Sequence, residues 1–82
     1  MRVMSPTVFR HKSYRAFFFS REEARMHVHV SCPEGEAKFW LEPMVALADH
    51  SKLSRRRLIE MQTLVEERRD EIAAAWKKHF GR

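Results

Sequence analysis

The stretch from His27 to Glu42, HVHVSCPEGEAKFWLE, decides the fold of this 82-residue chain. Val28 and Val30 alternate with histidines in its first half, and apolar residues alternate with polar ones in its second half. Such alternation is typical of β-strands that bury one face. Pro33 to Glu36 separates the two halves as a four-residue turn, with Gly35 where a positive φ is expected. The stretch therefore predicts a β-hairpin.

The length of that turn also predicts which residues lie opposite one another. The expected pairs on the apolar face are Cys32 with Ala37, Val30 with Phe39, and Val28 with Leu41. The expected pairs on the other face are His29 with Trp40 and His27 with Glu42, with Lys38 beside them. A slip of one residue would place charged side chains in the core, so the alternation supports this choice of faces.

The flanking segments complete an α+β domain. Residues 7–12 and 14–20 are rich in aromatic and β-branched residues and meet at Lys12-Ser13, which predicts a first hairpin. From Ser54 the apolar residues recur at helical spacing as far as Gly81. We predict a single domain over residues 1–82, in which two hairpins form one antiparallel four-stranded sheet (7–43) packed against a long C-terminal helix (54–80). The apolar stripe lapses at Arg68-Arg69, so either the helix bends there or its last turns pack on a second protomer.

Composition limits the classes of protein that fit. The chain has 16 Lys and Arg against 11 Asp and Glu, a net charge of +5, and one cysteine. A single cysteine excludes an internal disulfide and favours a reducing compartment, so we expect a cytoplasmic protein. No run of apolar residues is long enough for a membrane span. The positive charge suits RNA or an acidic protein as partner, and a chain this short gains stability from a partner or a homodimer through the sheet face or the helix end.

The face of the sheet that carries the histidines is the candidate site. Its predicted members combine cations with aromatic rings: Arg10, Arg15, Phe17, Phe19, His27, His29, Lys38, Trp40 and Glu42. Basic groups interleaved with aromatics are typical of platforms for single-stranded nucleic acid, where bases stack on rings and phosphates meet cations. The alternative is that a dimer mate or a partner protein covers this face, because monomers rarely expose large apolar patches.

His27 and His29 admit three interpretations. A metal site would need His11, His50 or Glu42 as a further ligand, which is a weak pattern, and we expect neither a metal nor a cofactor. Two imidazoles ~6.5 Å apart along a strand suit general acid and base catalysis on RNA, with Glu42 beside them and arginines stabilising the developing charge. The third interpretation is ordinary packing, with His27 held by Glu42 and His29 packed on Trp40.

A second basic cluster, Arg55-Arg56-Arg57, falls in the first turn of the predicted helix. The positive end of the helix dipole disfavours cations there. The cluster is therefore either an anion or partner site, formed with the helix N-terminal amides, or a solvated run offset by Arg56 and Glu60 at i,i+4.

Several of these segments together resemble a known family. Residues 6–10 (PTVFR), 27–30 (HVHV) and 36–43 (EAKFWLEP) are similar to the short bacterial domain-of-unknown-function family 4160. The resemblance continues through Leu53-Ser54 and on to Phe80. It implies no established reaction. It does imply a protein encoded beside a second small protein in a module of toxin-antitoxin type, and so a cognate small protein as partner.

Two functions follow as hypotheses. In the first, the chain is the toxin-like member and a small metal-independent ribonuclease, with His27, His29 and Glu42 as catalytic residues. In the second, it is a non-catalytic module that binds a partner protein or an operator through the sheet face and Arg55 to Arg57. A nuclease should keep both histidines accessible to solvent beside the cations, whereas a binding module should bury Phe17, Phe19 or Trp40 across an interface.

Overall fold

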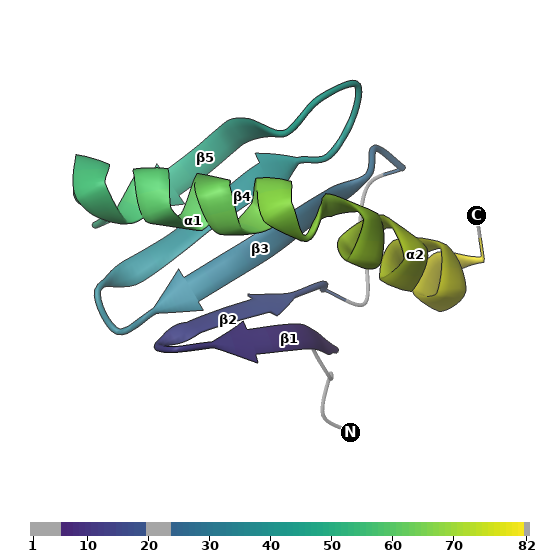
Figure 1. Ribbon diagram of the computed structural model, residues 1–82, viewed down its shortest axis with the longest axis horizontal. Coiled ribbons are helices and arrows are strands. Elements are labelled where there is room, and N and C mark those ends of the chain that lie inside the picture. The colour runs from purple at the N-terminus through teal and green to yellow at the C-terminus, as the bar shows by residue number, and fades with distance from the viewer. Residues whose placement is uncertain (1–5, 20–23, 82) are drawn as a thin grey trace.

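The computed structural model describes residues 6–19 and 24–81, which form one antiparallel sheet and two helices. The sheet contains five strands in chain order: β1 (Thr7–His11), β2 (Tyr14–Phe17), β3 (His27–Cys32), β4 (Gly35–Trp40) and β5 (Ala46–Ser51). Helices α1 (Arg55–Glu67) and α2 (Arg69–Phe80) lie on one side of it (Figure 1). The predicted α+β class is confirmed. The predictions of four strands and of one long helix are wrong.

Strand β5 was not predicted because its sequence carries little strand signal. Alanine and aspartate are depleted in strands, and Ala46–Ser51 contains two alanines and Asp49. As an edge strand it is also largely exposed, so no apolar alternation marks it. It pairs with β4 from Glu36 opposite Ser51 to Trp40 opposite Ala46, with a bulge at Ala48.

The hairpin of β3 and β4 has the predicted faces but a different register. Its turn is two residues, Pro33-Glu34, so Cys32 lies opposite Gly35 and each later pair shifts by two residues. An even shift keeps every side chain on its predicted face. The observed pairs are His27 with Trp40, Val28 with Phe39, His29 with Lys38 and Val30 with Ala37.

Gly35 is in strand β4 for a reason other than a positive φ. A Cβ atom at this position would lie 2.1 Å from the backbone oxygen of Ser51 on β5. Glycine is therefore required by the close approach of the neighbouring strand.

The first hairpin follows the prediction more closely. Its turn is at Lys12-Ser13, with His11 opposite Tyr14, and Lys12 takes the positive φ of 55°. Strand β2 ends at Phe17, and residue 20 of the predicted strand lies outside the described residues. A bulge at Val8 separates the pair Thr7 and Phe17 from the pair Phe9 and Ala16.

The helical segment divides at Arg68, within the lapse in the apolar stripe. Arg68 ends α1 with φ −111° and ψ 19°, so the chain changes direction before α2 begins. This bend turns Ile72 and Trp76 into the core, where both are almost fully buried. Both ends of the helical segment are capped: the Ser54 hydroxyl accepts from the Arg57 amide at 3.2 Å, and Gly81 ends α2 in a left-handed conformation.

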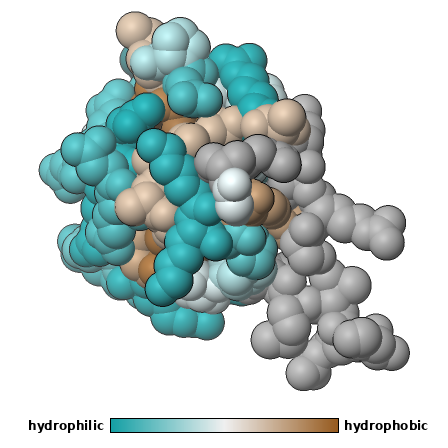
Figure 2. Space-filling view, turned by 90° about the vertical axis from the view of Figure 1, so that its right-hand side faces the viewer, coloured by the Kyte–Doolittle hydropathy of each residue, from teal (hydrophilic) through white to brown (hydrophobic). Residues whose placement is uncertain are grey.

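The core lies between the sheet and the two helices. Val28, Val30 and Phe39 contribute side chains with no exposed surface, and α1 adds Met61 and Val65. At the end where β2 stops and β3 starts, α2 extends past the strands (Figure 1). The view of the α2 end shows hydrophilic side chains with a band of apolar ones between them (Figure 2). Within residues 6–19 and 24–81, no helix is both long and apolar enough to cross a membrane.

Gly35→Ala should lower the free energy of unfolding by about 1–3 kcal/mol, because the new Cβ forces β5 away from β4. Urea unfolding followed by circular dichroism measures the change. Gly81→Ala is the matched control, since it meets no neighbour within 4 Å and adds only left-handed strain of about 1 kcal/mol. Equal stability of Gly35→Ala and the wild type would contradict the close approach of β5.

Candidate functional site

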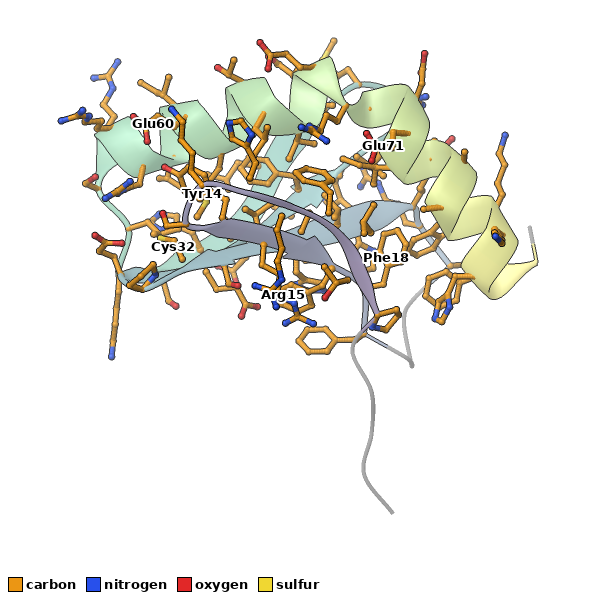
Figure 3. The ribbon with its side chains drawn as sticks, turned by 60° about the horizontal axis from the view of Figure 1, so that its bottom comes forward. Tyr14, Arg15, Phe18, Cys32, Glu60 and Glu71 are labelled. Carbon is orange, nitrogen blue, oxygen red and sulfur yellow. The ribbon has the colours of Figure 1, made fainter. Side chains whose placement is uncertain are left out.

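The face of the sheet turned away from α1, here called the distal face, carries three rows of side chains that run across the strands. The strand registers place these residues side by side. The first row is Arg10, Arg15, Ser31, Glu36 and Ser51. The second is Thr7, Phe17, His29, Lys38 and Asp49. The third contains His27 and Trp40. Figure 3 shows Arg15 on the side of the sheet away from the helices.

Aromatic rings pack tightly around the two histidines of this face. The His29 ring stacks on Phe17 with centroids 5.4 Å apart and meets the edge of Phe19 at 4.4 Å. The His27 ring lies 5.2 Å from that of His29 and 5.7 Å from that of Trp40. The Trp76 ring of α2 also packs against His27, with the two ring centroids 5.3 Å apart.

This packing removes both imidazoles from solvent. His27 has no exposed surface and His29 is 8% exposed. The His27 Nδ1 atom donates to the backbone oxygen of Arg25 at 2.8 Å, and His29 Nδ1 lies 3.5 Å from the Glu36 carboxylate. A general acid or base must come within hydrogen-bond distance of the proton it transfers. In this conformation no substrate atom reaches His27.

Cations surround the rings of Phe17, Phe19 and Trp40, here called the aromatic layer, and lie over two of them. The Arg15 guanidinium is 4.5 Å from the centre of the Phe17 ring, and its Nε donates to the Thr7 hydroxyl at 2.7 Å. Arg25 and Lys38 lie over Trp40 at 4.0 and 4.5 Å. Arg10 is exposed and directly opposite Arg15. Their opposed positions bring two guanidinium groups to one place on the distal face.

Most of the predicted site residues come together on the distal face, but two groups do not. The Glu42 side chain is exposed beyond the end of β4. Trp40 lies opposite His27, in the position predicted for Glu42. Arg55, Arg56 and Arg57 lie in the helix layer, on the other side of the sheet. Arg56 pairs with Glu60 at 3.5 Å, as one of the two interpretations expected.

Arg57 belongs instead to a polar network that joins α1 to both hairpins. Its guanidinium donates to the Tyr14 hydroxyl at 3.2 Å and pairs with Glu34 at 3.1 Å. The Tyr14 hydroxyl donates to Glu60, and the Cys32 thiol donates to Glu34 at 3.2 Å. Figure 3 shows Tyr14 directed from the hairpin towards Glu60 on α1. Beside the network, a hollow of about 410 Å³ separates the first hairpin from α1.

The network shifts the ionisation of its members. The hydrogen bond from Tyr14 lowers the pKa of Glu60, and the positive charges of Arg56 and Arg57 lower it further. The hydrogen bond from the Cys32 thiol lowers the pKa of Glu34, with a contribution from Arg57. Burial and the hydrogen bond to Glu60 raise the pKa of Tyr14, so its hydroxyl stays neutral beside the carboxylate.

Three charged residues of the distal face were not among its predicted members. Glu36 is two positions before Lys38 on the same strand, so alternation alone could have placed it there. Arg25 lies in the connection before β3 and Asp49 on the unpredicted β5, and neither carries a local signal. Cys32, expected in the core, is only partly buried at its edge.

The fold and this face define a small α+β domain with a basic, aromatic sheet surface. The family described as Domain of unknown function (DUF4160) matches residues 13–77, and the chain belongs to this family. The match confirms the resemblance, although residues 6–10 lie outside the matched segment. No curated protein matches the chain. No solved structure matches it either.

The Tyr14 network should make stability depend on pH in acid. Because the pKa of Glu60 is lower in the folded protein, its contribution is present above its ordinary value of about 4.5 and is lost as the pH falls through the folded value. Glu60→Gln should therefore lose less stability than the wild type between pH 5 and pH 3, measured by urea unfolding. Tyr14→Phe should also flatten the dependence, because it removes the donor to Glu60. Parallel curves for all three proteins would contradict this role.

Proposed function

We propose that the protein binds single-stranded RNA through its distal face, as the toxin-like member of a two-protein bacterial module, and that it acts by occupying RNA rather than by cleaving it. The observation that carries the proposal is the combination of clustered cations with buried imidazoles on one face. The two-protein part rests on the family resemblance alone.

The charges favour a phosphate ligand. Arg10 and Arg15 are direct cross-strand neighbours, so one phosphate at this point of the face can meet both guanidinium groups. Arg25 and Lys38 extend the cationic surface along Trp40. Phosphate contacts of this kind supply most of the affinity of sequence-independent nucleic-acid binding.

The aromatic residues favour a single strand over a duplex. Phe19 is 39% exposed and offers part of its ring surface to unpaired bases, whereas Arg25 and Lys38 lie over the half-buried Trp40 ring. Base stacking on such rings tolerates any sequence. His27 and His29 support these rings from beneath, and acid and base catalysis by them would first require the aromatic layer to open.

Binding of a fluorescein-labelled ten-nucleotide single-stranded RNA tests the proposal by fluorescence anisotropy. Replacing both Arg10 and Arg15 by Ala should weaken binding about tenfold or more, because charged hydrogen bonds to phosphate are lost. The slope of log affinity against log salt should also fall by about 0.7 for each lost phosphate contact.

The matched control replaces Arg55 and Arg56 by Ala, which removes the same net charge from the helix layer. It should bind nearly as well as the wild type. An equal loss in both double variants would mean that only net charge matters, and an absence of binding by the wild type would reject the proposal.

A single substitution separates binding from cleavage. His29→Phe keeps a ring against Phe17 and Phe19 but removes both imidazole nitrogens. Under our proposal, induced expression of the wild type slows bacterial growth, His29→Phe slows it equally, and the purified protein leaves the labelled RNA intact. Cleavage of the RNA by the wild type and its loss in a folded His29→Phe would instead establish a ribonuclease.

A further inference from the structure

A small polar hollow of about 270 Å³ lies on the distal face over β3, β4 and β5. Its lining is formed by His29, Glu36, Ala37, Lys38, Asp49, His50 and Ser51. Glu36 lies opposite Ser51, and Lys38 lies opposite Asp49, so four functional side chains occupy adjacent positions across two strands. The hollow therefore presents two carboxylates and one hydroxyl, and the Lys38 side chain lines it on the way to the Trp40 ring.

The two carboxylates are out of place on a surface that binds phosphate, since they repel it. One Asp49 oxygen, Oδ1, accepts from the His50 amide at 2.8 Å, and one Glu36 oxygen, Oε2, faces His29. Each carboxylate has a second oxygen that can accept a further hydrogen bond. The hollow therefore favours a ligand with hydrogen-bond donors, which the bases of RNA carry on their edges and its backbone phosphates do not.

We propose that this hollow binds the base of a guanosine nucleotide. The Watson–Crick edge of guanine carries two adjacent donors, N1–H and the N2 amino group, next to the acceptor O6. The two donors are complementary to the carboxylates of Glu36 and Asp49, and the Lys38 side chain lines the hollow beside them. Adenine and cytosine each offer one donor group on that edge, and uracil offers one N–H between two carbonyls.

The position of the hollow fits a strand whose phosphates meet Arg10 and Arg15. Arg15 on β2 and Glu36 on β4 belong to the same row and are two strand spacings apart, ~10 Å. One nucleotide covers such a span from its phosphate to the far edge of its base. The inference thus rests on the proposed function and adds a base preference to it.

Oligonucleotides that differ at one base measure the preference. The probes are labelled ten-nucleotide RNAs of adenosine, with a single central guanosine, inosine or adenosine. The wild type should bind the guanosine probe about tenfold more tightly than the all-adenosine probe, as expected for a bidentate base contact. Inosine keeps N1–H and O6 but lacks the amino group, so its probe should fall between them.

The variants Glu36→Gln and Asp49→Asn should lose most of this preference, because an amide replaces a carboxylate acceptor, while still binding the all-adenosine probe. Asp70→Asn is the matched control, an isosteric change at a fully exposed position on α2, and it should keep the preference. Equal affinity of the wild type for all three probes would overturn the guanine site and leave RNA binding by the distal face standing.

Free mononucleotides test the hollow independently of the RNA-binding proposal. Guanosine 5′-monophosphate, titrated into the isotopically labelled protein, should shift the backbone amide resonances of residues 49–51 and 36–38, and adenosine 5′-monophosphate should not. If no RNA binds but these shifts occur, the proposed function fails and the guanine site stands. If both nucleotides give the same shifts, or neither gives any, the guanine site is overturned.

Discussion

The alternation of side chains along β3 is the constraint on which the rest of the molecule depends. This strand is paired on both edges, with β2 and with β4, so it cannot change register without disrupting both hairpins. Val28 and Val30 point to the helices and have no exposed surface, while His27 and His29 point to the distal face. A slip by one residue would exchange valine for histidine in the core. The strand therefore fixes both the packing layer and the chemistry of the opposite surface.

Alternation and helical spacing were enough to predict the faces, and this explains which parts of the site could be anticipated. Arg15, Phe17, His29 and Lys38 lie where strand parity placed them, because parity survives an even shift of register. The pairing itself was wrong, since the sequence Pro33-Glu34-Gly35-Glu36 permits turns of different length, and in the observed two-residue turn Gly35 lies against Ser51 of β5. That contact is between segments distant in sequence. Glu42 was misplaced by the same shift of two residues.

The two basic clusters of the chain have separate structural roles. The cations of the distal face lie over rings or opposite one another. Arg57, in contrast, is held by Tyr14, Glu34 and Glu60, and it connects α1 to the turn of each hairpin. The pattern of three consecutive arginines gives no indication of this difference, because it arises only when β2 and the turn after β3 are brought against the helix. Of the three arginines, Arg57 therefore holds the helix against the two hairpins.

Both outer strands of the sheet contain a bulge, at Val8 in β1 and at Ala48 in β5. An edge strand is a template for further strand pairing, and a bulge interrupts the regular spacing of its free amide and carbonyl groups. The bulges therefore make both edges of the sheet less regular templates for a further strand. Irregular edges of this kind disfavour edge-to-edge strand pairing between copies of this small, aromatic-rich domain.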